Sequence, residues 1–276
     1  MTQQQNPVLV LGGNGKTGSR VAERLRQRGV GVRLGSRSGT PSFDWEEPAT
    51  WPAAIEGTSA VYISYYPDIA VPGAPEAIDA FAKQAIASGV RRLVLLSGRG
   101  EEEAQRAEEV LHASGADWTI VRCSWFNQNF SEGFLLDPVL SGEVALPAGD
   151  VPEPFVDAED IADVAALALT EEGHEGRIYE LTGPRMLSFA DAVGEIAAAT
   201  GRPIQFVPVP IEVYSAVLEG AGLPDDLVWL IRYLFSEVLD GRNAHVNDGV
   251  QQALGRPARD FSDYVRTTAA SGVWDV

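Results

Sequence analysis

The sequence contains very little cysteine and lysine and no long apolar segment. Its single cysteine, Cys123, has no partner for a disulfide bond within the chain. No apolar run reaches the roughly 18 to 20 residues that a membrane-spanning helix needs. The opening stretch MTQQQNP has none of the basic, apolar and small-residue zones of a signal peptide. These absences predict a cytoplasmic protein that does not insert into a membrane.

Positive charge is also scarce. The chain carries 21 Lys and Arg residues against 39 Asp and Glu residues, which gives a formal net charge of -18 at pH 7. Nucleic-acid binding depends on clustered Lys and Arg side chains, so this balance argues against a nucleic-acid partner. Hydrophobic residues make up 45% of the 276 residues, enough for one sizeable core with a smaller lobe.

The first half of the sequence alternates between short apolar runs and helical patterns. The strand-like runs lie at Val8–Leu11, Val30–Ser36, Ala60–Ser64, Arg92–Ser97 and Trp118–Arg122. Helical patterns such as Pro75–Ser88 and Glu102–Ala113 separate them. This alternation is typical of an α/β fold, and we predict a Rossmann-type, doubly wound parallel sheet with helices on both faces.

After about Phe126 helical patterns dominate the sequence, and helices are predicted at Asp160–Thr170, Ser188–Thr200, Ile211–Ala221 and Pro224–Leu239. We therefore expect residues 1–153 to form a Rossmann domain and residues 154–276 to form a smaller, mostly helical substrate lobe. Some C-terminal elements are expected to pack back on the Rossmann core. The proline-containing stretch Leu135–Asp157 is predicted to be loop with at most one short strand.

Three glycines follow the first predicted strand at intervals of three residues, at Gly12, Gly15 and Gly18. In a dinucleotide-binding loop the first glycine permits a sharp turn, the second lets the backbone approach a pyrophosphate, and the third lets the helix pack closely. The amides at the start of the helix then bind the anion. The embedded Gly-Lys-Thr is not a triphosphate loop, because that motif requires glycine where Val10 stands. The predicted cofactor loop also includes Asn14, Lys16 and Thr17.

The second predicted strand ends in basic and hydroxyl residues. No acid occurs between Glu23 and Asp44, whereas NAD-binding proteins place a carboxylate there for the ribose and NADP-binding proteins place an arginine there for the extra phosphate. Ser36 and Arg37 stand where this strand should end, and a guanidinium matches phosphate oxygens in a bidentate geometry. The sequence thus favours NADP(H) over NAD(H). Arg33, in the middle of the strand, is expected to lie on a face of the sheet.

Several stretches occur in an order that resembles one family. They are the glycine spacing, the SRS after the second strand, Asp44-Trp45, TIVRCSWFNQNF at Thr119–Phe130, PFVDAEDIADVAALAL at Pro154–Leu169, YELTGP at Tyr179–Pro184 and ALGRPARDFSDYV at Ala253–Val265. With these stretches the chain resembles the NmrA-like branch of the atypical short-chain dehydrogenases. Within that branch it is most similar to the festuclavine and agroclavine dehydrogenases of ergot alkaloid pathways and their bacterial relatives. The resemblance covers almost the whole chain and implies an oxidoreductase of secondary metabolism.

The resemblance also implies a site at the carboxyl ends of the strands, which is where ligands bind in open α/β sheets. The 2'-phosphate of the cofactor would lie on Ser36 and Arg37. The ribose and nicotinamide would be lined by Ser64, Tyr65, Ser97, Gly98 and Arg99. The substrate side would include Tyr66, Trp125, Phe126 and Asn129, with the substrate held between the nicotinamide and the smaller lobe. Cys123 departs from the family, where proline is usual at this position. A homodimer is compatible with the resemblance.

The sequence lacks the Tyr-x-x-x-Lys pair with which ordinary short-chain dehydrogenases exchange a proton with the substrate, and its only lysines are Lys16 and Lys83. Hydride delivery to an iminium ion, an activated C=C bond or a quinone-like molecule needs orientation and little acid catalysis. We therefore expect an NADPH-dependent reductase of a small aromatic or heterocyclic molecule. Tyr65 and Tyr66 are the candidate catalytic proton donors, with packing against the cofactor as the alternative. The missing pair also favours a second hypothesis, a non-catalytic NADP(H)-sensing regulatory protein of the NmrA type.

The remaining reactive residues form no pattern typical of a site. The three histidines are isolated in the sequence, and no metal site is predicted. Cys123 has no histidine close in sequence and is expected to be a buried or pocket-wall thiol. Glu101, Glu102 and Glu103 stand at the start of a predicted helix, where negative charge suits the helix dipole, and we expect this acidic cluster to be solvated.

Overall fold

A six-stranded sheet organises the first part of the computed structural model, which describes residues 6–276. Its strands lie in the order β2-β1-β3-β4-β5-β7, and the pairings among β1 to β5 are parallel. Their bounds are β1 (Val8–Leu11), β2 (Val32–Gly35), β3 (Ala60–Ile63), β4 (Arg92–Gly98), β5 (Asp117–Cys123) and β7 (Arg177–Leu181). Because β2 and β3 flank β1 on opposite sides, the strand order reverses there, and a ligand crevice is expected beyond the carboxyl ends of these three strands.

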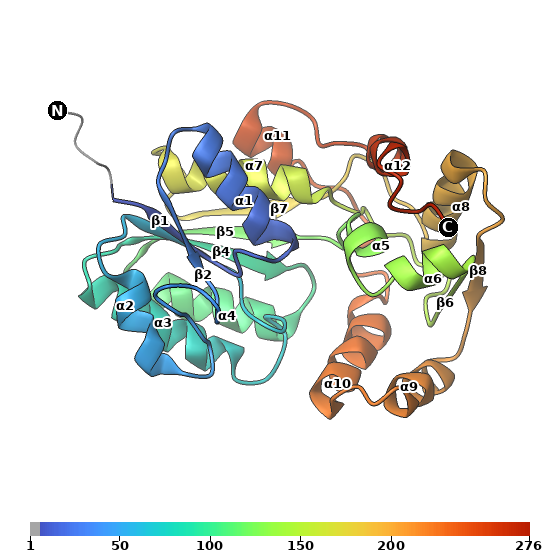
Figure 1. Cartoon of the computed structure of the whole chain (residues 1–276), viewed down its shortest axis with the longest axis horizontal. Helices are drawn as coiled ribbons and strands as arrows, with labels where there is room; N and C mark the ends of the chain where they lie inside the picture. The colour runs from blue at the N-terminus through green and yellow to red at the C-terminus, as the bar shows by residue number, and fades with distance from the viewer. Residues whose placement is uncertain (1–5) are drawn as a thin grey trace. The chain divides into compact units, whose positions relative to one another are not determined.

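Helices cover both faces of this sheet, as Figure 1 shows. One face carries α1 (Lys16–Gln27), α7 (Ala158–Thr170) and α11 (Gly249–Leu254), and the other carries α2 (Trp51–Ile55), α3 (Ala74–Ala87) and α4 (Glu102–Ala113). Strands β1 and β3 are buried at every position, which explains why they read as continuous apolar runs rather than alternating ones. The predicted α/β class and doubly wound Rossmann-type sheet are therefore confirmed.

The chain divides into two compact units that exchange segments along the sequence. The sheet unit comprises residues 6–123 with Ala158–Glu180 and Gly249–Gly255, and the second unit comprises Ser124–Asp157, Leu181–Asp248 and Arg256–Val276. The continuous division at residues 153 and 154 differs from this arrangement. The two divisions differ because α7 and β7 return to the sheet, where the helix covers one face and the strand extends the edge beside β5.

The second unit combines a two-stranded parallel sheet with helices around an aromatic core. Its elements are α5 (Asn129–Glu132), α6 (Leu136–Ser141), β6 (Glu143–Leu146), α8 (Phe189–Thr200), β8 (Gln205–Pro208), α9 (Ile211–Gly220), α10 (Asp225–Tyr233), a π-helical turn (Leu234–Val238) and α12 (Phe261–Ala270). Strand β6 pairs with β8. In the core the ring of Phe155 contacts those of Phe130, Phe189 and Phe261 at centroid distances of 5.1 to 5.8 Å, so burial of apolar rings holds this unit together.

Two predictions of local structure need correction in the second unit. The stretch Leu135–Asp157, predicted as loop with at most a short strand, contains helix α6 as well as strand β6. Pro138 is compatible with α6 because it lies in the first turn, where its missing N–H costs no helical hydrogen bond. The predicted helix Pro224–Leu239 is divided, since α10 ends at Tyr233 and a π-helical turn follows.

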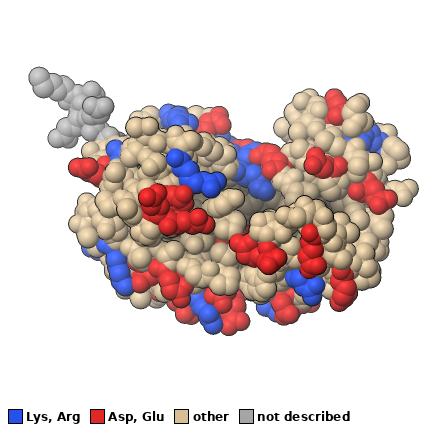
Figure 2. Space-filling model, turned by 60° about the horizontal axis from the view of Figure 1, so that its bottom comes forward, with Lys and Arg blue, Asp and Glu red and all other residues tan. Residues whose placement is uncertain are grey.

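No helix within residues 6–276 is long and apolar enough to cross a membrane. The sequence MTQQQNP, on which the expectation of a cytoplasmic protein partly rests, falls mostly outside this described range. On the face drawn in Figure 2, Asp and Glu side chains are spread over the surface with Lys and Arg side chains between them.

Candidate functional site

The glycine loop after β1 is built by close approaches that exclude side chains. Gly12 has a φ of +63°, a conformation that glycine adopts at little cost, and its carbonyl accepts a hydrogen bond of 2.8 Å from the amide of Gly15. A Cβ on Gly18 would overlap the carbonyl oxygen of Gly12 and lie 2.7 Å from its carbonyl carbon. The first and third glycines are thus required by geometry, as the motif predicts.

The start of α1 carries no acidic side chain of its own. Gly15 is the N-cap residue, no side chain caps the helix, and its first turn contains no acid. The amides of Lys16, Thr17 and Gly18 therefore form the positive end of a 12-residue helix. Asn14 and Gly15 are exposed in front of it, whereas the side chain of Thr17 is buried. This end of the helix has the donor arrangement that binds a pyrophosphate.

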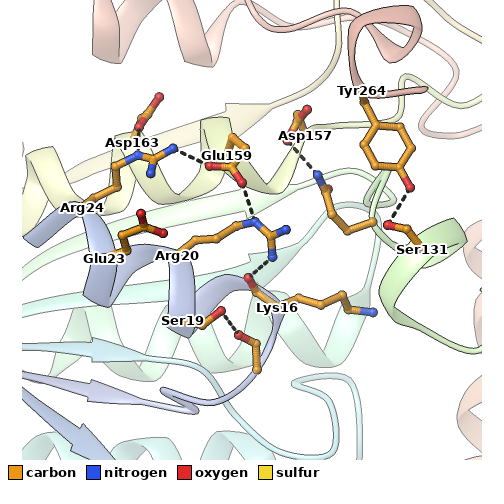
Figure 3. Close-up of polar contacts among 12 residues, drawn as sticks. Lys16, Ser19, Arg20, Glu23, Arg24, Ser131, Asp157, Glu159, Asp163 and Tyr264 are labelled. Carbon is orange, nitrogen blue, oxygen red and sulfur yellow. Dashed lines mark hydrogen bonds and ion pairs between the residues drawn. The ribbon is translucent and has the colours of Figure 1, made fainter. Parts of the chain in front are cut away.

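Ion pairs fix α1 against α7, as Figure 3 shows. The Nε atom of Arg20 lies 2.7 Å from a carboxylate oxygen of Glu159, and the Nε atom of Arg24 lies 2.7 Å from one of Asp163. Arg24 also pairs with Glu159. These half-buried pairs hold α1, which carries the proposed anion-binding amides, against α7. Both guanidinium groups are therefore already paired with carboxylates of the protein.

Arg37 lies in the turn that follows β2, and its guanidinium is exposed. The turn is fixed by the carbonyl of Ser36, which accepts hydrogen bonds from the amides of Gly39 and Phe43 at 3.0 and 2.9 Å. The guanidinium carbon of Arg37 lies 5.5 Å from the ring centroid of Tyr66. Within residues 6–276 this guanidinium forms no ion pair. A cation held by an aromatic ring beside the glycine loop is available to an added phosphate.

Arg33 has a different role. Its Nη1 atom donates to the carbonyl oxygens of Ala54 and Glu56 at 2.8 and 2.6 Å. The side chain therefore ties β2 to the end of α2, in agreement with its expected place on a face of the sheet.

The residues after β3 lie partly in an aromatic cluster. Tyr65 is half-buried with its ring 4.8 Å from that of Trp45, and burial raises the pKa of its phenol, with smaller contributions from the carboxylates of Glu46 and Glu76. Ser64 accepts a hydrogen bond of 3.2 Å from Trp45 through its carbonyl oxygen. Tyr66 is 67% exposed. Of the two candidate proton donors, Tyr65 packs into the protein and Tyr66 stacks with Arg37.

Ser97 and Arg99 bind protein groups at the end of β4. The Ser97 hydroxyl donates to Glu108 at 2.5 Å, and both residues are buried. Arg122 also binds Glu108, with its Nε at 2.9 Å from a carboxylate oxygen. The Nε of Arg99, which is 3% exposed, lies 3.7 Å from a carboxylate oxygen of Glu180. These side chains form a charged network that connects β4, α4, β5 and β7.

Gly98, between them, packs against the carboxyl group of Glu101. A Cβ on Gly98 would overlap both carboxylate oxygens of Glu101. Glu101 is the N-cap residue of α4, yet its side chain makes no capping hydrogen bond, and its Oε2 is enclosed without a hydrogen-bond partner. The expectation that the whole acidic cluster is solvated is therefore wrong for Glu101, although it holds for Glu102, which is 80% exposed.

Cys123 ends β5 and is buried, as expected for a core or pocket-wall thiol. Burial raises the pKa of this thiol well above its usual value; the negative charge of Glu101 adds to the effect, and Arg99 opposes it. The neutral thiol is a poor nucleophile under these conditions. No group of three or more His, Cys, Asp or Glu side chains that could hold a metal occurs in the described residues 6–276.

Of the predicted substrate residues in the second unit, Trp125 packs against its aromatic core. Trp125 is half-buried and contacts Phe189 and Phe235 at ring distances of 5.3 and 5.1 Å. Phe126 forms a β-bridge with Val156, and Asn129 begins α5. Side-chain hydrogen bonds from Gln128 to Asp157 at 2.8 Å and from Tyr264 to Ser131 at 2.8 Å fix the same region (Figure 3).

The structure thus brings the predicted cofactor residues together in the sheet unit, around the carboxyl ends of β1, β2, β3 and β4. A model of a family described as NAD(P)H-binding matches residues 12–172, which include this whole set of cofactor residues. The chain belongs to this family.

Within the family, relatives with named activities match almost the whole chain. An NAD(P)H azoreductase from Xenophilus azovorans is 30% identical over 96% of this chain and 98% of its own length. An agroclavine dehydrogenase from Claviceps fusiformis is 31% identical over 94% of this chain and 96% of its own length. These matches confirm the predicted NmrA-like, atypical short-chain dehydrogenase branch, and both of these relatives are oxidoreductases by name.

The fold also matches that of solved structures. The NADPH complex of an NADPH-dependent quinone oxidoreductase from Escherichia coli aligns with a TM-score of 0.78 over 94% of this chain and 99% of that one, at 20% identity. At this identity the likeness concerns the fold.

Proposed function

We propose that this protein is an NADPH-dependent reductase that transfers hydride to a small, electron-poor aromatic or heterocyclic molecule. The acceptor would be an iminium ion, an activated C=C bond or a quinone-like group. The observation that carries the proposal is the combination of an uncapped helix start at α1 with the unpaired guanidinium of Arg37 after β2. The bound cofactor would supply the hydride, and the chain's own residues would hold and orient the reactants.

The preference for NADPH rests on charge. Arg37 is an exposed cation on a chain with a net charge of -18, so a phosphate near it gains a local attraction that opposes the repulsion from the net negative charge. The Ser36 hydroxyl would add a hydrogen-bond donor beside it. Gly12 to Gly18 would bind the pyrophosphate, while Ser64, Tyr65 and the backbone at Ser97 to Arg99 would line the ribose and nicotinamide.

The substrate class follows from what the chain does not provide. The dyad of ordinary short-chain dehydrogenases is missing, so reduction of an unactivated carbonyl would lack its usual acid. An iminium ion already carries the positive charge that accepts hydride, and a quinone or activated alkene delocalises the resulting negative charge. Tyr66, Trp125, Phe126 and Asn129 are proposed as substrate contacts, and an acidic surface favours cationic or neutral substrates over anionic ones.

The experiment is a comparison of cofactor oxidation with a panel of acceptors. The purified chain is mixed with NADPH or NADH and with a quinone, an α,β-unsaturated ketone, an azo dye or a cyclic iminium ion, and nicotinamide absorbance is followed. We expect oxidation of NADPH by at least one acceptor and a lower kcat/KM with NADH. Tight NADPH binding without oxidation by any acceptor would overturn the reductase.

That outcome would favour the second candidate, a regulatory protein that binds NADP(H) without turnover. The observation on its side is the missing Tyr-x-x-x-Lys pair. It requires a protein partner whose affinity changes with the bound nucleotide, because a ligand shifts an equilibrium only by its differential affinity for the two states. A stoichiometric partner that NADP releases in a pull-down would support the regulatory protein.

A further inference from the structure

The side chain of Glu101 occupies an unusual position for a helix N-cap. An N-cap acid normally turns toward the first amides of its own helix, but this carboxyl group makes no such bond and lies against Gly98 at the end of β4. Only glycine at position 98 leaves room for it there. The fold therefore places a carboxyl group at the carboxyl end of β4, where the proposed function puts the nicotinamide.

The groups around Glu101 provide no neutralising partner for it. Its Oε2 atom is enclosed and has no hydrogen-bond partner. Asp68, from the loop after β3, and Glu108, from α4, both face it with negative charge, and the Cys123 thiol lies nearby at the end of β5. The two arginines of the region pair with other acids, Arg122 with Glu108 and Arg99 with Glu180.

This environment favours the protonated acid. An enclosed carboxylate oxygen without a donor has lost its hydration, and repulsion from Asp68 and Glu108 disfavours a further negative charge. Both effects, burial first, raise the pKa of Glu101 well above its usual value. Burial also raises the pKa of Asp68, whose Oδ1 accepts a hydrogen bond of 2.8 Å from the amide of Ala70.

We propose that the carboxyl group of Glu101 is the proton donor of the reductase. This inference rests on the proposed function. Hydride from the nicotinamide brings one hydrogen and two electrons to one end of the acceptor, and the O–H of Glu101 gives its proton to the other end. That end is the oxygen of a quinone, the second nitrogen of an azo group, or the carbon next to the activating group of an alkene.

The proton balance separates two kinds of acceptor. After the step Glu101 is a carboxylate, and it regains a proton from water before the next turnover. An iminium ion needs no proton, because hydride alone converts it to a neutral amine. The role of Glu101 is therefore specific to neutral acceptors, and a loss of structure would affect both kinds equally.

The test compares Glu101→Gln with Glu102→Gln, which removes an exposed carboxylate one residue further on. General acid catalysis contributes about 10²- to 10⁴-fold. We expect Glu101→Gln to lower kcat for a quinone or an enone at pH 7 by at least about 100-fold and to leave kcat for a cyclic iminium ion unchanged. Wild-type kcat for the quinone should fall as Glu101 loses its proton at high pH. Glu102→Gln should behave as the wild type with every acceptor.

A second readout needs no cofactor. In the infrared difference spectrum between wild type and Glu101→Gln at neutral pH, the carbonyl band of a protonated carboxylic acid should appear in the wild type only. Its disappearance with rising pH should follow the fall in kcat. Because this spectrum is taken on the cofactor-free protein, it reports on Glu101 whether or not an efficient substrate has been found.

Several outcomes overturn the inference while leaving the reductase intact. They are equal quinone reduction by Glu101→Gln and wild type, a difference spectrum between the two that lacks the acid band, and a wild type that reduces only iminium ions. A large loss with the quinone in Tyr65→Phe or Tyr66→Phe, together with full activity of Glu101→Gln, would assign the proton to a tyrosine. If the wild type oxidises NADPH with none of the acceptors tested, both proposals are overturned.

Discussion

The guanidinium carbon of Arg37 lies 5.5 Å from the centroid of the Tyr66 ring. The two residues follow β2 and β3, the strands on either side of β1, so they flank the glycine loop. At an exposed site such a cation–π contact contributes about 0.5 to 1 kcal/mol. It orients the guanidinium without neutralising it, which leaves the charge available to a phosphate.

Replacement of Arg37 by alanine should weaken NADPH much more than NADH. A hydrogen bond to a charged group contributes about 1.5 to 3 kcal/mol, or roughly 10- to 150-fold in Kd. NADH lacks the 2'-phosphate, so its Kd should change little. Titration calorimetry of both nucleotides measures the difference.

Arg26→Ala is the matched control for this change. Arg26 is exposed on α1 and away from the start of that helix, so its loss alters the net charge by the same amount without touching the proposed phosphate site. Equal weakening of NADPH by the two variants would show that long-range charge, rather than contact, determines the affinity.

Gly18→Ala should impair the binding of both nucleotides. The added methyl group would overlap the backbone of Gly12, which cannot move without changing the loop. Overpacking of this kind costs about 1 to 3 kcal/mol of stability, and NADPH and NADH should lose affinity to a similar extent. Thermal unfolding and calorimetry check the two effects.

Gly194→Ala tests whether any added methyl group at a helical glycine has this effect. Gly194 lies exposed in α8, and nothing is within 4 Å of the position of its Cβ. The substitution should stabilise the protein by about 0.5 to 1 kcal/mol. If Gly18→Ala also bound both nucleotides normally, the close approach of loop and helix would not be required for binding.

Gly98→Ala should reproduce the effect of Glu101→Gln. The added Cβ would occupy the place of the Glu101 carboxyl group, and this flexible side chain can turn away into solvent. The acid would then titrate near the ordinary range of glutamic acid, about pH 4.3, and quinone reduction at pH 7 would fall while iminium reduction would persist. A carboxylic acid band still present at neutral pH would contradict the proposed displacement.

The stability of the protein should depend on pH through Glu101. The unfolded chain releases this proton near pH 4.3, whereas the folded protein keeps it to higher pH because the folded-state pKa is raised. Between the two pKa values the folded state binds more protons, so the free energy of unfolding falls as pH rises, by about 1.36 kcal/mol per pH unit. Glu101→Gln should therefore be more stable than the wild type above the folded-state pKa. Parallel stability curves from pH 4 to 9 would contradict this.

The sequence predicted the sheet well because β1 and β3 are buried at every position and read as uninterrupted apolar runs. The glycine loop could also be predicted from the sequence, since its requirements are local: a turn at Gly12 and close packing at Gly18. The sequence did not predict how the two units interleave along the chain. The return of α7 and β7 to the sheet depends on packing between segments that are far apart in the sequence.

Glu101 shows most clearly why part of the candidate site could not be predicted. By sequence it is one of three acids at a helix start, and solvation is the ordinary outcome for such residues. Its actual surroundings depend on the missing side chain of Gly98 and on Asp68, which comes from a different loop. The run Gly98-Arg99-Gly100-Glu101 was the only local signal, because it allows the chain to fold back on the strand end.

Single turnover of bound cofactor decides whether this protein transfers hydride. The protein is mixed with one equivalent of NADPH and then with a quinone or a cyclic iminium ion, and nicotinamide absorbance and product are measured together. We predict one equivalent of reduced product for each NADPH oxidised, at a rate above that of free NADPH. Bound NADPH that stays reduced with every acceptor would contradict a reductase function.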